Sequence, residues 1–202
     1  MNYRVVADLR HLPLHGMGPS STTWWGTLGF MLLEGTGFAL VIGAYFYLAL
    51  NAPQWPLAAP PPDLGAGTLI TLILLASVVP NVLVGRWAKQ EDLRKVQWGL
   101  LVMVAAGLLP LAIRVFEFKA FHVLWDTNAY GSLVWTMLGL HAVHLLTDVA
   151  DTIVLAALMF TRHGLNTKRF GDVHDNVAYW NFVVASWLPI YLVLYWYPRL
   201  SA

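Results

Sequence analysis

The sequence of 202 residues contains no cysteine and few charged side chains, and both shortages restrict what the protein can be. Without cysteine, the chain has no disulfide, no thiolate metal site and no cysteine nucleophile. Only 11% of the residues are Asp, Glu, Lys or Arg, against roughly 25% in a soluble globular domain. The formal net charge of +1 provides no basic stripe for a nucleic acid partner. The shortage of charge therefore indicates a membrane protein.

The missing charges leave long uncharged windows. Residues 67–85, 96–113, 130–147 and 176–198 contain no Asp, Glu, Lys or Arg, and residues 28–50 contain Glu34 as their one charged side chain. Each window is close to the ~20 residues that a helix needs to cross ~30 Å of hydrocarbon. Because lipid offers no hydrogen-bond partners and the windows show no alternation of polar and apolar residues, we predict five transmembrane helices.

The predicted fold is an all-α integral membrane bundle of residues 24–202, preceded by a polar N-terminal tail of residues 1–23. The predicted helices cover residues 24–50, 67–86, 96–114, 130–160 and 177–197. Pro80, Pro110 and Pro189 lie inside three of these helices, where we expect kinks. An N-terminus on the inner side places nine of the twelve Lys and Arg residues inside, in agreement with the positive-inside rule, and five spans then place the C-terminus outside.

Glu34 is the clearest candidate for a functional residue, because a polar side chain inside a membrane span is costly. The neighbouring Gly35 and Gly37 indicate that another helix packs close to this point. Two interpretations stay open at this stage. Glu34 either exchanges or buffers protons, or it is a buried neutral glutamic acid that is hydrogen-bonded to a neighbouring helix.

The fourth predicted helix carries a polar stripe that consists of His141, His144, Asp148 and Asp151. These residues fall within an arc of roughly 80°, so we expect the stripe to face protein rather than lipid. The stripe extends over about 15 Å, which is too long for one metal ion, although three of its members could share one. We therefore favour a hydrogen-bonded network over a metal site. Because Glu34 and Asp148 lie at similar depth in their helices, we predict that Glu34 joins this network.

The positions of the histidines argue against a redox cofactor in this chain. A haem held by two histidines between helices needs one from each helix, but His141 and His144 share one helix and the other five histidines lie in predicted tails or loops. We predict that the chain binds no haem, copper or other metal. Arg114 and Glu117, one turn apart at the end of the third helix, are predicted to form an ion pair at the membrane interface.

Several segments in order along the chain resemble subunit III of the haem-copper oxidases, which includes cytochrome c oxidase subunit III and its quinol-oxidase relatives. The helix with Glu34 resembles the glutamate-bearing helix of that family. The other matching segments are Arg114-Val115-Phe116-Glu117-Phe118, similar to Gln-x-x-Glu-Tyr; Gly139-Leu140-His141-Ala142-Val143-His144, similar to Gly-x-His-Gly-x-His; and Val177-Ala178-Tyr179-Trp180-Asn181-Phe182, similar to Ala-x-Tyr-Trp-His-Phe. Five helices correspond to forms that lack the two N-terminal helices of the seven-helix version.

The resemblance implies a subunit that performs no catalysis itself and packs on subunit I, with subunit II in the same complex. It implies haem and copper in those partner subunits, structural phospholipids bound to this chain, and a role in proton uptake and stability during turnover in aerobic electron transport. The expected location is the cell membrane of a bacterium or archaeon. Glu34 matches the family glutamate, and Glu117, Tyr179 and Trp180 match positions with structural or lipid-binding roles.

Departures from the family pattern leave other functions open. Asn181 stands in place of a histidine, Arg114 in place of a glutamine, and Asp148 and Asp151 in place of apolar residues or glycine. The parent complex could therefore be a nitric oxide reductase with this chain as an accessory protein. A self-standing proton-coupled transporter that uses Glu34, Asp148 and Asp151 is a second alternative, which the odd number of helices and the lack of an internal repeat disfavour. A small metal-dependent membrane enzyme is a third.

Overall fold

A computed structural model describes residues 16–57 and 60–200, and these residues form helices and connecting turns without any strand. The helices are α1 (Thr22–Asn51), α2 (Leu64–Lys89), α3 (Leu93–Lys119), α4 (Ala129–Met159), α5 (Lys168–Tyr191) and α6 (Tyr197–Leu200), with short helical turns at Gly18–Ser20 and Arg162–Leu165 and a π-helical segment at Leu192–Trp196. Five of the helical segments are long and apolar enough to cross a membrane, and the last runs without a break from Lys168 to Leu200. The predicted all-α class with five spans is confirmed.

The helices extend beyond their predicted limits, most of all at the start of α5. This helix begins at Lys168 instead of residue 177. The charged residues of this segment indicated a loop, but Phe170 and Val173 are buried against the bundle and hold the segment in helical form. Of the predicted N-terminal tail, residues 1–15, with His11 and His15, lie outside the described residues.

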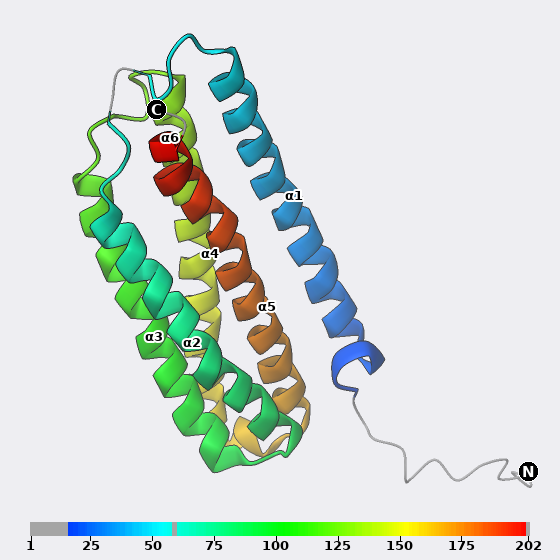
Figure 1. Cartoon of the computed structure of the whole chain (residues 1–202). Coiled ribbons are helices and arrows are strands. Elements are labelled where there is room, and N and C mark those ends of the chain that lie inside the picture. The colour runs from blue at the N-terminus through cyan, green and yellow to red at the C-terminus, as the bar shows by residue number, and fades with distance from the viewer. Residues whose placement is uncertain (1–15, 58–59, 201–202) are drawn as a thin grey trace, which may run out of the picture.

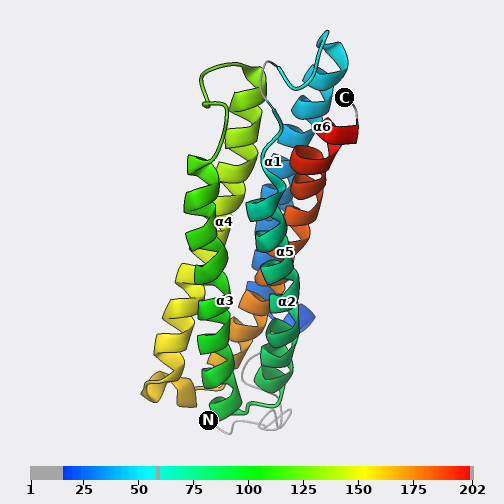
Figure 2. The ribbon, with the colours of Figure 1, turned by 60° about the vertical axis from the view of Figure 1, so that its left-hand side comes forward.

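The bundle has a compact part and a peripheral helix. In Figures 1 and 2, α2 and α3 lie side by side over their length and α4 and α5 cover them, whereas α1 stands at the edge. The buried residues of α1 are Met31, Phe38 and Tyr45, which are spaced by seven and form one narrow seam. Side chains away from this seam, such as Leu32 and Leu33, are exposed on the described surface. We conclude that α1 is the helix least covered by the rest of the chain.

The two ends of the bundle differ in charge. The start of α1, the α2–α3 turn and the α4–α5 turn lie together at one end, and α6 lies at the other (Figure 1). Arg86, Lys89 and Arg94 are at the first end, which we predict to face the inner side. Asp92 begins α3 there by accepting a hydrogen bond from the backbone N–H of Lys95 at 3.2 Å. The hydrogen bonds from Lys95 hold the pKa of the Asp92 carboxyl below its usual value.

Two tryptophans of α5 fill the centre of the bundle. Trp180 and Trp187 are almost fully buried. The indole N–H of Trp180 donates to Ser77 Oγ at 2.9 Å, and that of Trp187 donates to Thr71 Oγ1 at 2.8 Å. A buried indole N–H without an acceptor would be costly, so the hydroxyl groups of Ser77 and Thr71 in α2 provide the acceptors that the two tryptophans of α5 need.

Side chains of α4 and α5 pack closely against Gly107 of α3. A Cβ atom there would collide with Val149 and would lie 3.1 Å from Trp180. We expect Gly107→Ala to lower the free energy of unfolding in detergent by about 1–3 kcal/mol, because the close packing cannot take up another methyl group. Gly43→Ala in α1, where the added atom meets open space, is the matched control and should be neutral or slightly stabilising. Equal thermal midpoints for the two variants would contradict this prediction.

Candidate functional site

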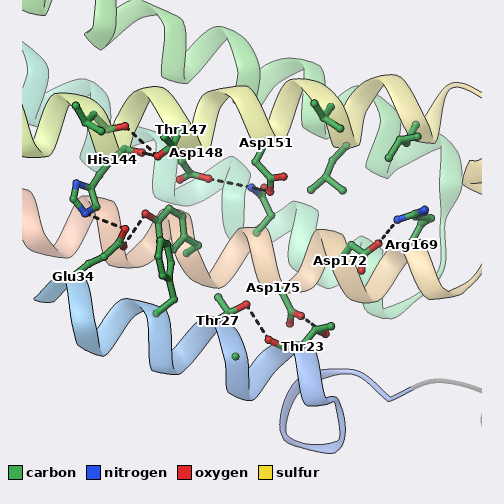
Figure 3. A pocket seen from close by; sticks show the side chains of 18 residues that line it. Thr23, Thr27, Glu34, His144, Thr147, Asp148, Asp151, Arg169, Asp172 and Asp175 are labelled. Carbon is green, nitrogen blue, oxygen red and sulfur yellow. Dashed lines mark hydrogen bonds and ion pairs between the residues drawn. The ribbon is translucent and has the colours of Figure 1, made fainter.

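A cleft of about 800 Å³ opens between α1, α4 and α5 at the end where α1 and α5 begin (Figure 3). Its apolar wall contains Phe30, Val143, Val154, Leu155 and Leu158. Five carboxyl groups also line it, namely Glu34, Asp148, Asp151, Asp172 and Asp175, together with the basic side chains of His144 and Arg169. The cleft therefore combines carboxyl groups from all three helices with an apolar surface from α1 and α4.

The carboxyl group of Glu34 lies between α4 and α5. The hydroxyl group of Tyr179 donates to Glu34 Oε2 at 2.8 Å, and His144 Nε2 lies 3.1 Å from Glu34 Oε1. The side chains of His144 and Glu34 are only 8% and 15% exposed. The contact between Glu34 and the polar stripe of α4, predicted from their equal depth, is present in the structure.

The polar stripe of α4 divides into two parts. His144, Asp148 and Asp151 line the cleft (Figure 3). His141 does not line the cleft; it is fully buried in the bundle, with its Nε2 3.1 Å from the backbone oxygen of Val183. The Phe38 ring lies beside both histidines, 4.9 Å from the centre of the His144 ring and 6.4 Å from that of His141.

One residue of the polar stripe is not buried. Asp151 is exposed on the wall of the cleft. The cause is the position of α1, which leaves this turn of α4 uncovered and so makes room for the cleft. Within residues 16–57 and 60–200, no three His, Cys, Asp or Glu side chains are arranged to hold a metal ion.

Residues 6–199 match the family model described as cytochrome c oxidase subunit III. The chain belongs to that family. Curated relatives include the cytochrome c oxidase subunit 3 of Alkalihalophilus pseudofirmus, 25% identical over 200 residues that cover 94% of this chain and 95% of the relative. The corresponding protein of Thermostichus vulcanus is 25% identical over 84% of this chain and 85% of its own length. That of Bacillus sp. strain PS3 is 27% identical over 83% of this chain and 84% of its own length.

Membership of the cytochrome c oxidase subunit III family gives the chain its general place in the cell. It is an integral membrane protein and a subunit of a haem-copper oxidase complex, which is an oxidoreductase of the respiratory chain. The resemblance found in the motifs around Glu34, His141 and Trp180 is thereby confirmed.

The subunit III fold contains a second polar cluster, which corrects the prediction for Arg114 and Glu117. Instead of an ion pair at the interface, the two side chains are 2% and 3% exposed and bonded to each other inside the bundle. The guanidinium group of Arg114 lies 4.3 Å from the centre of the Trp187 ring, and its Nη2 is 3.4 Å from His141 Nδ1. Tyr195 donates its hydroxyl proton to Glu117.

The burial of this pair depends on the end of the last span. The π-helical segment Leu192–Trp196 continues α5 and places the fully buried Tyr195 against Glu117. A charged pair near the end of an apolar window resembles an interfacial pair in sequence, because hydropathy does not show which distant aromatic side chains cover it.

The two remaining predicted site residues, Tyr179 and Trp180, lie in different parts of the bundle. Tyr179 binds Glu34 in the cleft, and Trp180 lies in the core beside Gly107. The sequence did not identify Asn176, whose Nδ2 donates to Asp148 Oδ1 at 3.0 Å and to Asp151 Oδ2 at 3.3 Å.

It also did not identify Arg169, Asp172 and Asp175 as cleft residues, because they belong to the part of α5 that was expected to be a loop. The spacing of Phe170, Val173 and Val177 by three and four residues was the signal that could have placed them on a helix.

Proposed function

We propose that this chain is a non-catalytic subunit III that packs on subunit I of the oxidase, beside subunit II, and supports proton uptake and stability during turnover. Haem and copper then reside in the partner subunits, and this chain contributes the cleft and its carboxyl groups. The observation that carries the proposal is the contact between Glu34 and His144 in a cleft that opens at the predicted inner end.

The hydrogen-bond pattern of His144 supports a proton-linked role for Glu34. His144 Nδ1 lies 2.6 Å from the backbone oxygen of Leu140, which can only accept, so Nδ1 carries a hydrogen. In a neutral ring Nε2 is then an acceptor, and it faces an oxygen of Glu34 at 3.1 Å. His144 Nε2 makes no hydrogen bond within the described residues, so the space between it and Glu34 is a place at which a proton can bind. This supports the proposal that Glu34 exchanges protons.

The apolar wall of the cleft supports the binding of phospholipid. Phe30, Val154 and Leu158 offer an apolar surface beside polar groups at the mouth, which suits an acyl chain with its headgroup at the membrane interface. The exposed apolar side chains of α1, among them Leu32 and Leu33, extend this surface. We propose that lipid fills the apolar part of the cleft, beside Phe30 of α1 and Val154 and Leu158 of α4.

Glu34→Gln tests the proton-linked role, because it keeps the shape of the side chain and removes its ionisable group. We expect the variant complex to assemble with its full content of haem but to take up protons more slowly and lose activity several-fold sooner during turnover. Proton uptake and the decay of oxygen consumption are measured on the purified complex. Glu91→Gln, in the exposed turn between α2 and α3, is the control and should match the parent.

Two results would count against the proposal. If the Glu34→Gln complex equals the parent in both measurements, Glu34 serves only in packing. If the tagged chain does not co-purify with a haem-bearing subunit in mild detergent, the proposed association with subunits I and II is wrong.

A further inference from the structure

Asp148 and Asp151 form a second acidic group in the cleft, distinct from the contact between Glu34 and His144. The two residues are one helical turn apart on α4, so their side chains are neighbours on one face. Asp148 is 1% exposed, whereas Asp151 lies on the exposed wall of the cleft. The group thus connects the inside of the bundle with the surface of the cleft.

A single amide group links these two carboxyl groups. Asn176 Nδ2 donates to Asp148 Oδ1 at 3.0 Å and to Asp151 Oδ2 at 3.3 Å, while Asn176 Oδ1 lies 3.3 Å from the hydroxyl oxygen of Thr152. Figure 3 shows the side chains of Asp148 and Asp151 on the same wall of the cleft. Because an amide nitrogen only donates, it is suited to hold two acceptors of like charge near each other.

The second oxygen of Asp148 has no partner. Asp148 Oδ2 is buried and accepts no hydrogen bond from any residue in the described part of the chain. An ionised oxygen in this position would be both desolvated and unpaired, which is costly. The nearest linked group, Asp151, has the same charge, and two carboxyl groups that share a site do not readily ionise together.

The charged and titratable groups of the surrounding helices do not neutralise the pair. Those that face the cleft are Glu34 of α1, His144 of α4, and Arg169, Asp172, Asp175 and Tyr179 of α5. Arg169 Nη1 lies 2.7 Å from Asp172 Oδ2, and His144 faces Glu34. Among the ion pairs of the described residues, none joins a Lys or Arg side chain to Asp148 or Asp151.

We propose that the pair of Asp148 and Asp151 carries a single proton at neutral pH, on Asp148, while Asp151 stays ionised, and that this pair is a second proton-holding site of the cleft. A hydronium ion of the aqueous phase gives its proton to one carboxylate oxygen, which forms a carboxylic acid and leaves a water molecule, and the charge of the pair changes from −2 to −1. Its use in proton uptake rests on the function proposed above, but its occupancy by a proton does not.

A bound cation such as Na⁺ would be another way to compensate the two charges. The hydrogen bonds disfavour it, because the position between the carboxyl groups is occupied by the N–H donors of Asn176 rather than by an oxygen ligand. The experiment below separates these two occupants.

Infrared spectroscopy of the purified full chain in detergent tests the proposal without turnover. The carbonyl stretch of a protonated carboxyl group is distinct from that of a carboxylate and shifts in D₂O. At pH 7 we expect Asp148→Asn to lose one protonated-carboxyl signal that the parent shows. Asp151→Asn, a change at an exposed position that leaves the core intact, should weaken the same signal because the like charge is gone. Asp126→Asn, in the exposed α3–α4 connection, is the control and should retain it.

Several outcomes would overturn the proposal. An unchanged protonated-carboxyl signal in both Asp148→Asn and Asp151→Asn would show that the pair holds no proton at pH 7. A parent signal that appears only when Na⁺ is withdrawn would assign the site to a cation. Failure of the Glu34→Gln test leaves this result unaffected, because the infrared signal is read from the resting chain and not from oxidase activity.

Discussion

Arg114→Met should lower the free energy of unfolding by about 3–5 kcal/mol, the largest loss that we expect from any one charge in the described chain. Arg114 and Glu117 are bonded to each other and are 2% and 3% exposed. Methionine fills a similar volume beside Trp187 but leaves the carboxylate of Glu117 buried without its cation, and such a charge cannot reach water. Unfolding of the detergent-solubilised chain, followed by circular dichroism, measures the loss.

Two further variants separate the charge from the packing in this experiment. Lys119→Met removes an exposed charge from the same end of α3 and should change the stability by less than about 0.5 kcal/mol. In the double variant Arg114→Met, Glu117→Gln, the unpaired charge is gone, while the amide can still accept from Tyr195, so most of the stability should return. A single variant as stable as Lys119→Met would show that the buried pair is not ionised or not needed.

Trp180→Ala should destabilise the protein by a comparable amount, about 3–5 kcal/mol. Trp180 is 1% exposed, lies against Gly107 of α3 and donates to Ser77 Oγ of α2 at 2.9 Å. Its truncation leaves a cavity where three helices meet and leaves the hydroxyl group of Ser77 without this partner. The thermal midpoint of the purified chain in detergent measures the effect.

Trp125→Ala provides the comparison for this substitution. Trp125 is 63% exposed in the connection between α3 and α4, so its loss creates no cavity and should leave the midpoint nearly unchanged. If both variants melt together, the contacts of Trp180 contribute little and the bundle is held mainly by its other helix contacts.

The two polar regions of the bundle have different expected roles. The cluster around Arg114 is covered by Trp187 and Tyr195 and is closed to the cleft, so its substitution should act on stability. Glu34, Asp148 and Asp151 line the cleft, so their substitution by the neutral amide should act on proton binding. Phe38, packed beside both His141 and His144, lies between these regions.

The amino-acid sequence by itself determined the features that follow from local composition. Uncharged windows of membrane length were enough to predict the five spans, because crossing lipid requires a continuous apolar helix. The 3.6-residue period was enough to place His144 and Asp148 on one face, and the depth of Glu34 was enough to predict that it meets that face.

Only the tertiary structure decided the state of the individual charges. Whether Arg114 and Glu117 are buried depends on Trp187 and Tyr195, some seventy residues and more away in the chain. Whether Asp151 is exposed depends on how far α1 stands from α4, and hydropathy has no information on that distance. A charged side chain is stabilised or left unpaired by the groups around it in space, and those groups come from helices that only folding brings together.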